Sequence, residues 1–143
     1  MSAFITQSDY NASIRTEILD AITRADPSMV EMTEDRAVEE MAGYINSRYD
    51  TTAIFSEVGT NRSPVLVMLA IDITLYHLHA VYNPMRFPEL RKDRYEQAIK
   101  YLSGVQKGNI NPVGWPLLAN DEGSTGDAKQ HYFTSNKKRT NHY

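Results

Sequence analysis

Apolar residues recur every three or four positions in four stretches of the chain, the spacing that places them on one face of an α-helix. The pattern predicts helices over about 7–24 and 33–49, a third over about 64–82, and a fourth that runs from Pro88 toward Gly104. Because the four helices are close together in sequence, they favour an all-α fold, a small four-helix bundle.

Helix start and stop signals support the first two helices. Thr6 and Asp9 resemble a capping box, in which each residue satisfies a free backbone N–H of the first turn. Asp26-Pro27 is predicted to break the first helix. Thr33, followed by two acidic residues, gives the start signal of the second helix.

The third helix is apolar almost all the way round. Ser63-Pro64 supplies an N-cap and a first-turn proline, and Asn83-Pro84 ends the helix, whereas the polar residues before Ser63 are expected to form an irregular connector. A helix without a polar face needs neighbours on every side. The third helix is therefore expected at the centre of the bundle.

After Gly108 the sequence changes to Asn, Gly, Pro and Ser, and helical periodicity disappears. The chain is thus expected to divide into a helical adaptor domain, 1–107, and an extended irregular C-terminal arm, 108–143. From residue 120 on, Tyr132-Phe133 is the only dense aromatic cluster, too little to offset the entropy of ordering such a segment. We therefore expect other chains to order this arm.

Composition limits the classes of function. The chain has 15 Lys and Arg against 18 Asp and Glu, a net charge of -3, so it has no overall basic field for nucleic acid. It has no cysteine, which is compatible with assembly in a reducing cytoplasm. No secretory signal is recognised, and the uninterrupted apolar run 65–71 is far shorter than the roughly 20 residues of a membrane span. We expect no membrane partner.

Residues that carry chemistry are sparse. His77 and His79 are two positions apart and point to different sides of a helix, so they cannot share a metal, and a core and a boundary histidine are expected. Asp72 interrupts the most apolar helix and must be paired or face an opening. An ion pair with Arg48 is favoured over a catalytic role. No phosphate-binding loop or nucleophile pattern accompanies it, so no cofactor, metal or enzymatic activity is expected.

Large aromatic residues in a segment without its own core are typical interface anchors. The basic residues Lys137, Lys138 and Arg139 of the same segment could also contact DNA phosphates. A pocket within the same chain remains an alternative for Trp115. The partner-binding candidates are Trp115, Leu117, Leu118, Tyr132, Phe133, Lys137, Lys138 and Arg139.

Several segments occur in an order that resembles one known family. These are Glu40 to Tyr49, then Ala70-Ile71-Asp72 and Tyr76-His77-Leu78-His79, and finally Arg94 to Leu102. From about Phe4 to Trp115 the chain resembles the helical head-to-tail connector proteins of tailed phages, also called adaptor or head completion proteins, especially those of Mu-like prophages.

The resemblance implies a non-catalytic virion protein of the phage neck that is assembled in the host cytoplasm. Such proteins form a ring, commonly of twelve copies, beneath the portal, and further neck or tail proteins join it to the tail. DNA passes through the channel of the ring without sequence-specific binding. The long segment after Leu118 lies outside the resemblance, so its partner stays open.

Two other functions remain. A small helical DNA-binding or packaging module needs a basic, exposed recognition helix, and the fourth predicted helix offers Arg91, Arg94 and Lys100 interleaved with acids. An enzyme with Asp72 or His77 in a pocket ranks last, because no nucleophile or metal cluster supports it.

Overall fold

The computed structural model describes residues 3–119, and these residues form α-helices, one short 3-10 helix and no strand longer than a single bridge. The helices are α1 (Gln7–Tyr10), α2 (Thr16–Thr23), α3 (Pro27–Ile45), α4 (Thr51–Ser56), η1 (Gly59–Asn61), α5 (Pro64–Tyr82) and α6 (Glu89–Gln106). The all-α prediction is confirmed.

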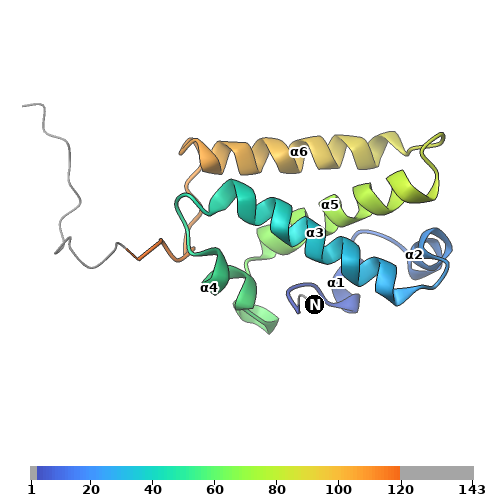
Figure 1. Ribbon diagram of the computed structural model, residues 1–143, viewed down its shortest axis with the longest axis horizontal. Helices are drawn as coiled ribbons and strands as arrows, with labels where there is room; N and C mark the ends of the chain where they lie inside the picture. Colours follow the sequence, from blue (N-terminus) through green and yellow to red (C-terminus); the bar gives the residue numbers. More distant parts are fainter. Residues whose placement is uncertain (1–2, 120–143) are drawn as a thin grey trace, which may run out of the picture.

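Helix α5 is the centre of the fold, as its apolar sequence predicted. Helices α3 and α6 lie along it, while α1 and α2 cover another side (Figure 1). Leu66, Ile73 and Leu75 are fully buried. α5 is long and apolar enough to cross a membrane by length and composition, but 61% of its most apolar stretch is buried inside the fold, as in the core helix of a soluble protein.

The limits of α5 agree with the sequence signals. The Ser63 side chain accepts a hydrogen bond from the backbone N–H of Leu66, Pro64 occupies the first turn, and Asn83 follows the last residue. Helix α6 continues past Gly104 to Gln106, and Gly108 follows its end with a φ of 79° and an N–H that donates to the Val105 carbonyl. The ends of these helices depend on caps and turns made by neighbouring residues, which can be recognised in the sequence.

The prediction of one continuous helix over about 7–24 is wrong, because the structure has two shorter helices there. The first turn of the predicted helix is α1, the chain turns over residues 11–15, and the helix resumes as α2. The Tyr10 carbonyl accepts the backbone N–H groups of both Ser13 and Ile14, which closes the turn. Tyr10 and Ile14 are both buried, so the break serves the packing of two large side chains.

The second predicted helix begins earlier and ends earlier than expected. α2 already ends at Thr23, with Arg24 as its C-cap residue, and Asp26 caps α3. The Asp26 carboxylate accepts the backbone N–H of Ser28, and Pro27 is the first residue of the helix. The region expected as an irregular connector contains α4 and η1, and Asp50 caps α4 through the N–H of Ala53.

Candidate interaction surfaces

Residues 113–118, called the strap from here on, lie against the helical body. The ring of Trp115 meets the ring of Tyr49 edge-on, with centroids 5.4 Å apart, and its Nε1 donates to Ser63 Oγ at 3.3 Å. The backbone N–H of Asp50 donates to the Pro116 carbonyl at 2.9 Å. The first part of the predicted arm is therefore joined to the helices.

The strap divides the predicted partner-binding residues into two groups. Trp115 is partly buried against its own chain, as in the alternative of a pocket within the same chain. Leu117, in contrast, is 68% exposed and Leu118 is 46% exposed. These two leucines are open to a partner. The candidates Tyr132, Phe133, Lys137, Lys138 and Arg139 lie outside the described residues.

Arg48 does not pair with Asp72, so the predicted ion pair is wrong. Its guanidinium donates instead to the Val105 carbonyl at 3.2 Å and to Asn111 Oδ1 at 3.0 Å. Arg48 follows the end of α3, beside the last turn of α6. It therefore joins α6 and the chain that leads into the strap to the end of α3.

Asp72 faces α6 instead. It is 4% exposed, its Oδ2 lies 3.8 Å from Arg94 Nη1, and its buried Oδ1 has no hydrogen-bond partner among the described residues. Burial raises the pKa of Asp72, and the charges of Arg94 and Arg91 oppose that rise. Arg91 also donates to the Ser13 carbonyl at 2.7 Å, so this pair of arginines connects α6 to both α5 and the α1–α2 turn.

A polar cluster joins α3, α5 and α6. The two carboxylate oxygens of Glu40 bind His77 Nε2 at 2.9 Å and the Tyr95 hydroxyl at 2.8 Å, and the Tyr95 ring stacks on Tyr76 with centroids 3.9 Å apart. Burial, followed by the bond to Glu40, raises the pKa of Tyr95. The cluster therefore links three helices through two hydrogen bonds and a ring stack.

The two histidines of α5 take different environments, as expected. His79 is buried and its Nδ1 bonds to the Leu75 carbonyl, whereas the side chain of His77 is 34% exposed. Across residues 3–119, no three His, Cys, Asp or Glu side chains gather where they could hold a metal ion.

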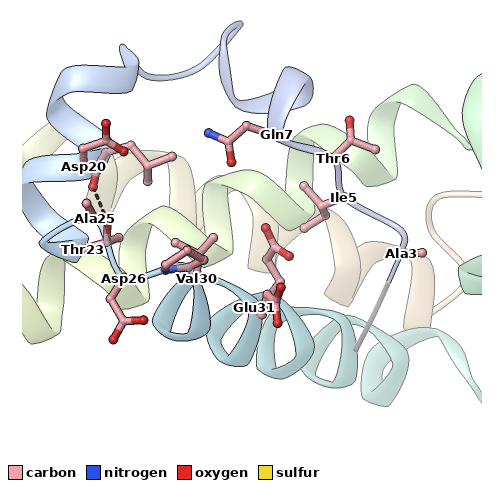
Figure 2. A pocket seen from close by; sticks show the side chains of 13 residues that line it. Ala3, Ile5, Thr6, Gln7, Asp20, Thr23, Ala25, Asp26, Val30 and Glu31 are labelled. Carbon is pink, nitrogen blue, oxygen red and sulfur yellow. Dashed lines mark hydrogen bonds between the residues drawn. The ribbon is translucent and has the colours of Figure 1, made fainter.

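A pocket of about 440 Å³ lies between residues 3–7, α2 and the start of α3 (Figure 2). We call it the acidic pocket, because Asp20, Asp26, Glu31 and Glu34 line it. Glu34 is 8% exposed, and its Oε1 accepts a 2.6 Å hydrogen bond from the Tyr10 hydroxyl. Burial raises the pKa of Glu34, and the nearby charge of Glu31 adds to the rise.

Sequence reasoning missed the acidic pocket. It interpreted Glu34 as a first-turn acid of a helix starting at Thr33, whereas the earlier start of α3 places Glu34 inside the helix and facing the core. The available signal was Asp26-Pro27, an N-cap and first-turn pair of the same kind as Ser63-Pro64.

Several exposed apolar side chains lie at the two ends of the body, and others, among them Val58 and Met68, lie elsewhere on it. The α5–α6 connection and the residues beside it carry Val81, Tyr82, Met85 and Leu90, with Met85 91% exposed. The strap carries Val113, which is 98% exposed, besides its two leucines. Figure 1 places the α5–α6 connection and the strap at opposite ends of the long axis. The described body thus has two unlike apolar patches.

Comparison with known proteins places the chain in a family. No curated protein and no solved structure matches it. The model of one family, described as Bacteriophage Mu, Gp36, matches residues 4–129, which covers the whole helical body and the strap. Membership of this family indicates a phage structural protein associated with the virion. The chain therefore belongs to the Bacteriophage Mu Gp36 family and is a Mu-like phage protein.

Proposed function

We propose that this protein is a non-catalytic structural subunit of the phage neck. It forms a ring, of twelve copies, under the portal protein, and this ring joins the DNA-filled head to the tail and lines the DNA channel. The observation that carries the proposal is the family match over residues 4–129, together with the resemblance of the helical segments to head-to-tail connectors.

The two apolar patches support a ring. A closed ring of identical subunits uses heterologous contacts, in which one surface of a subunit meets a different surface of the next. Met85 and Leu90 belong to one patch and Val113 and Leu117 to the other, so the described body carries unlike apolar surfaces. A two-fold dimer, by contrast, needs only one self-complementary patch.

The charge of the chain suits a channel through which DNA slides. A wall that binds phosphate tightly would slow the duplex, and this chain has a net charge of -3. On α6, Arg91 donates to the Ser13 carbonyl and Arg94 lies 3.8 Å from the buried Asp72 carboxylate. These contacts also weaken the DNA-binding alternative, since they occupy basic groups that its recognition helix needs.

Electron microscopy of the protein bound to its portal tests this function. We expect a closed ring coaxial with the portal when the two proteins are co-expressed and purified together. Substitution of Met85 and Leu90 by Ser removes apolar area from one patch and should reduce ring formation, whereas Met32→Ser, on an exposed face of α3, is the matched control. A monomer that does not bind the portal contradicts the proposal.

A further inference from the structure

The acidic pocket holds negative charge that no basic residue of its own lining balances. Four of its lining residues are carboxylic acids, and none is Lys, Arg or His. Figure 2 shows Asp20, Asp26 and Glu31 on the walls of the pocket across from Ile5 and Gln7, with the Asp26 carboxylate turned outward. Because the charge of Glu31 already disfavours ionisation of Glu34, a cationic group that enters the pocket beside these two carboxylates gains Coulomb energy.

The inner wall of the pocket adds a second kind of recognition. Ile5, Leu19 and Val30 line it with apolar side chains. Glu34, nine-tenths buried at the base, receives a hydrogen bond from Tyr10 and from no other described residue. The pocket therefore suits a ligand that combines an apolar or aromatic group with positive charge, and a purely polar cation would leave the apolar wall uncovered.

One segment of this chain has that combination. Tyr132–Arg139 contains two adjacent aromatic residues followed by Lys137-Lys138-Arg139, and no acid. Among the residues beyond the described part of the chain, this is where aromatic and basic side chains occur together. The charge of the segment is thus complementary to that of the acidic pocket.

The chain between them is long enough. The N–H of Leu118 bonds to the Arg48 carbonyl beyond the end of α3, whereas the acidic pocket is at the start of α3. The 19 residues of α3 rise about 28 Å. The 14 residues from Leu118 to Tyr132 can span up to about 50 Å when extended. This reach exceeds the length of α3, so the segment can meet an acidic pocket at that distance on an adjacent copy.

We propose that segment Tyr132–Arg139 of one copy docks in the acidic pocket of a neighbouring copy. Lys137, Lys138 and Arg139 lie against the carboxylates, and Tyr132-Phe133 covers the apolar wall. This inference deepens the proposed function, on which it rests, because it names the contact that links adjacent subunits of the ring.

A peptide titration tests the docking site. The full chain carrying Lys137→Glu, Lys138→Glu and Arg139→Glu is titrated with a fluorescent peptide of residues 128–143 in the original sequence. We expect binding that weakens as salt is added. Adding Glu31→Lys to this chain should weaken binding at least about tenfold. Adding Glu39→Lys, an exposed position of the same helix outside the pocket, should not change it.

Equal affinity of the peptide for the Glu31→Lys and Glu39→Lys chains overturns the proposal, as does absence of binding to the parent chain. Because a lysine at position 31 can disturb the fold, Glu31→Gln is measured as well, and circular dichroism verifies that each chain keeps its helices. Glu31→Gln should weaken binding in the same direction and to a smaller extent.

Photocrosslinking distinguishes docking between copies from docking within one chain. Benzoylphenylalanine at position 133 of the full chain, in the complex with the portal, should give a two-chain product linked to residues 3–7 or 19–34. A product confined to single chains, or linked elsewhere, overturns the inference. In that case a ring seen by electron microscopy leaves the proposed function intact, whereas absence of the ring contradicts the function itself.

Discussion

The Tyr10 hydroxyl donates a 2.6 Å hydrogen bond to Glu34 Oε1 in the core, 24 positions away in sequence. The two residues connect α1 to α3, and both are buried. Burial, followed by the bond to Glu34, raises the pKa of Tyr10. This bond fixes the short first helix on the body and holds Glu34, which lines the acidic pocket.

Tyr10→Phe should lower the free energy of unfolding by about 1–3 kcal/mol, because Glu34 Oε1 loses its donor inside the protein. Urea denaturation monitored by circular dichroism measures the change. Tyr82→Phe, at an exposed position, is the matched control and should have almost no effect. Equal stability of Tyr10→Phe and the original chain would contradict the bond.

Glu34→Gln should change how stability depends on pH. Since the pKa of Glu34 is raised in the folded protein, the folded state binds more protons than the unfolded chain just above the ordinary pKa of 4.5. Stability therefore falls as pH rises through the folded pKa of Glu34. Gln keeps an acceptor for Tyr10 and does not ionise. The stability of Glu34→Gln relative to the original chain should rise between pH 4.5 and neutral pH, which denaturation at each pH measures; a constant difference contradicts it.

Asp9→Asn should have the opposite pH dependence. The hydrogen bonds and charge of Arg62 lower the pKa of Asp9 from 3.8 to about 2, and the two side chains approach to 2.6 Å. A lowered pKa contributes stability above 3.8 that is lost as pH falls toward 2. We expect a loss of about 2 kcal/mol at neutral pH that shrinks at acid pH. A loss that is independent of pH would show that packing, not charge, is responsible.

Trp115→Ala should detach the strap while the helices remain folded. The substitution removes the ring contact with Tyr49 and the bond to Ser63, worth about 1–2 kcal/mol together. Leu102→Ala in the fully buried core should cost more, about 2–5 kcal/mol. Hydrogen exchange measures the two effects: Trp115→Ala should release the N–H groups of Asp50 and Leu118 and leave α5 protected. Loss of protection throughout α5 contradicts a separate strap.

Gly108→Ala should destabilise the end of α6. Gly108 has a φ of 79°, and an added Cβ would lie 3.0 Å from Arg48 Nη1. We expect a loss of about 1–2 kcal/mol. Gly43→Ala is the control, since Gly43 lies inside α3 and an added Cβ there meets nothing within 4 Å. It should raise the free energy of unfolding by about 0.5–1 kcal/mol. Thermal denaturation compares the stabilities of the two variants. A Gly108→Ala variant that is more stable than the original chain contradicts the role of Gly108 at the end of α6.

The sequence predicts the parts of the fold that depend on neighbouring residues. Ser63-Pro64 starts α5, Asn83 ends it, and Gly108 follows α6, all through local bonds or backbone conformation. The break after Tyr10 could not be predicted in this way. Residues 11–15 have no strong helix breaker, and the turn exists because Tyr10 and Ile14 both pack in the core.

Long-range pairs were harder to predict. Asp72 was recognised as a buried carboxylate that needs a partner, but periodicity does not say which helix faces it, and the structure places Arg94 there instead of Arg48. The exposed leucines of the strap were predicted as binding residues. The acidic pocket was not, since it forms only when the start of α3, α2 and residues 3–7 meet.

The strap also determines where the rest of the chain starts. Because Trp115 is bonded beside the start of α5 and Leu118 beside the end of α3, the chain after them is tethered at this point of the body. A tethered segment meets nearby surfaces at an effective concentration in the millimolar range, far above that of a free peptide. Even a contact of low intrinsic affinity is then well occupied.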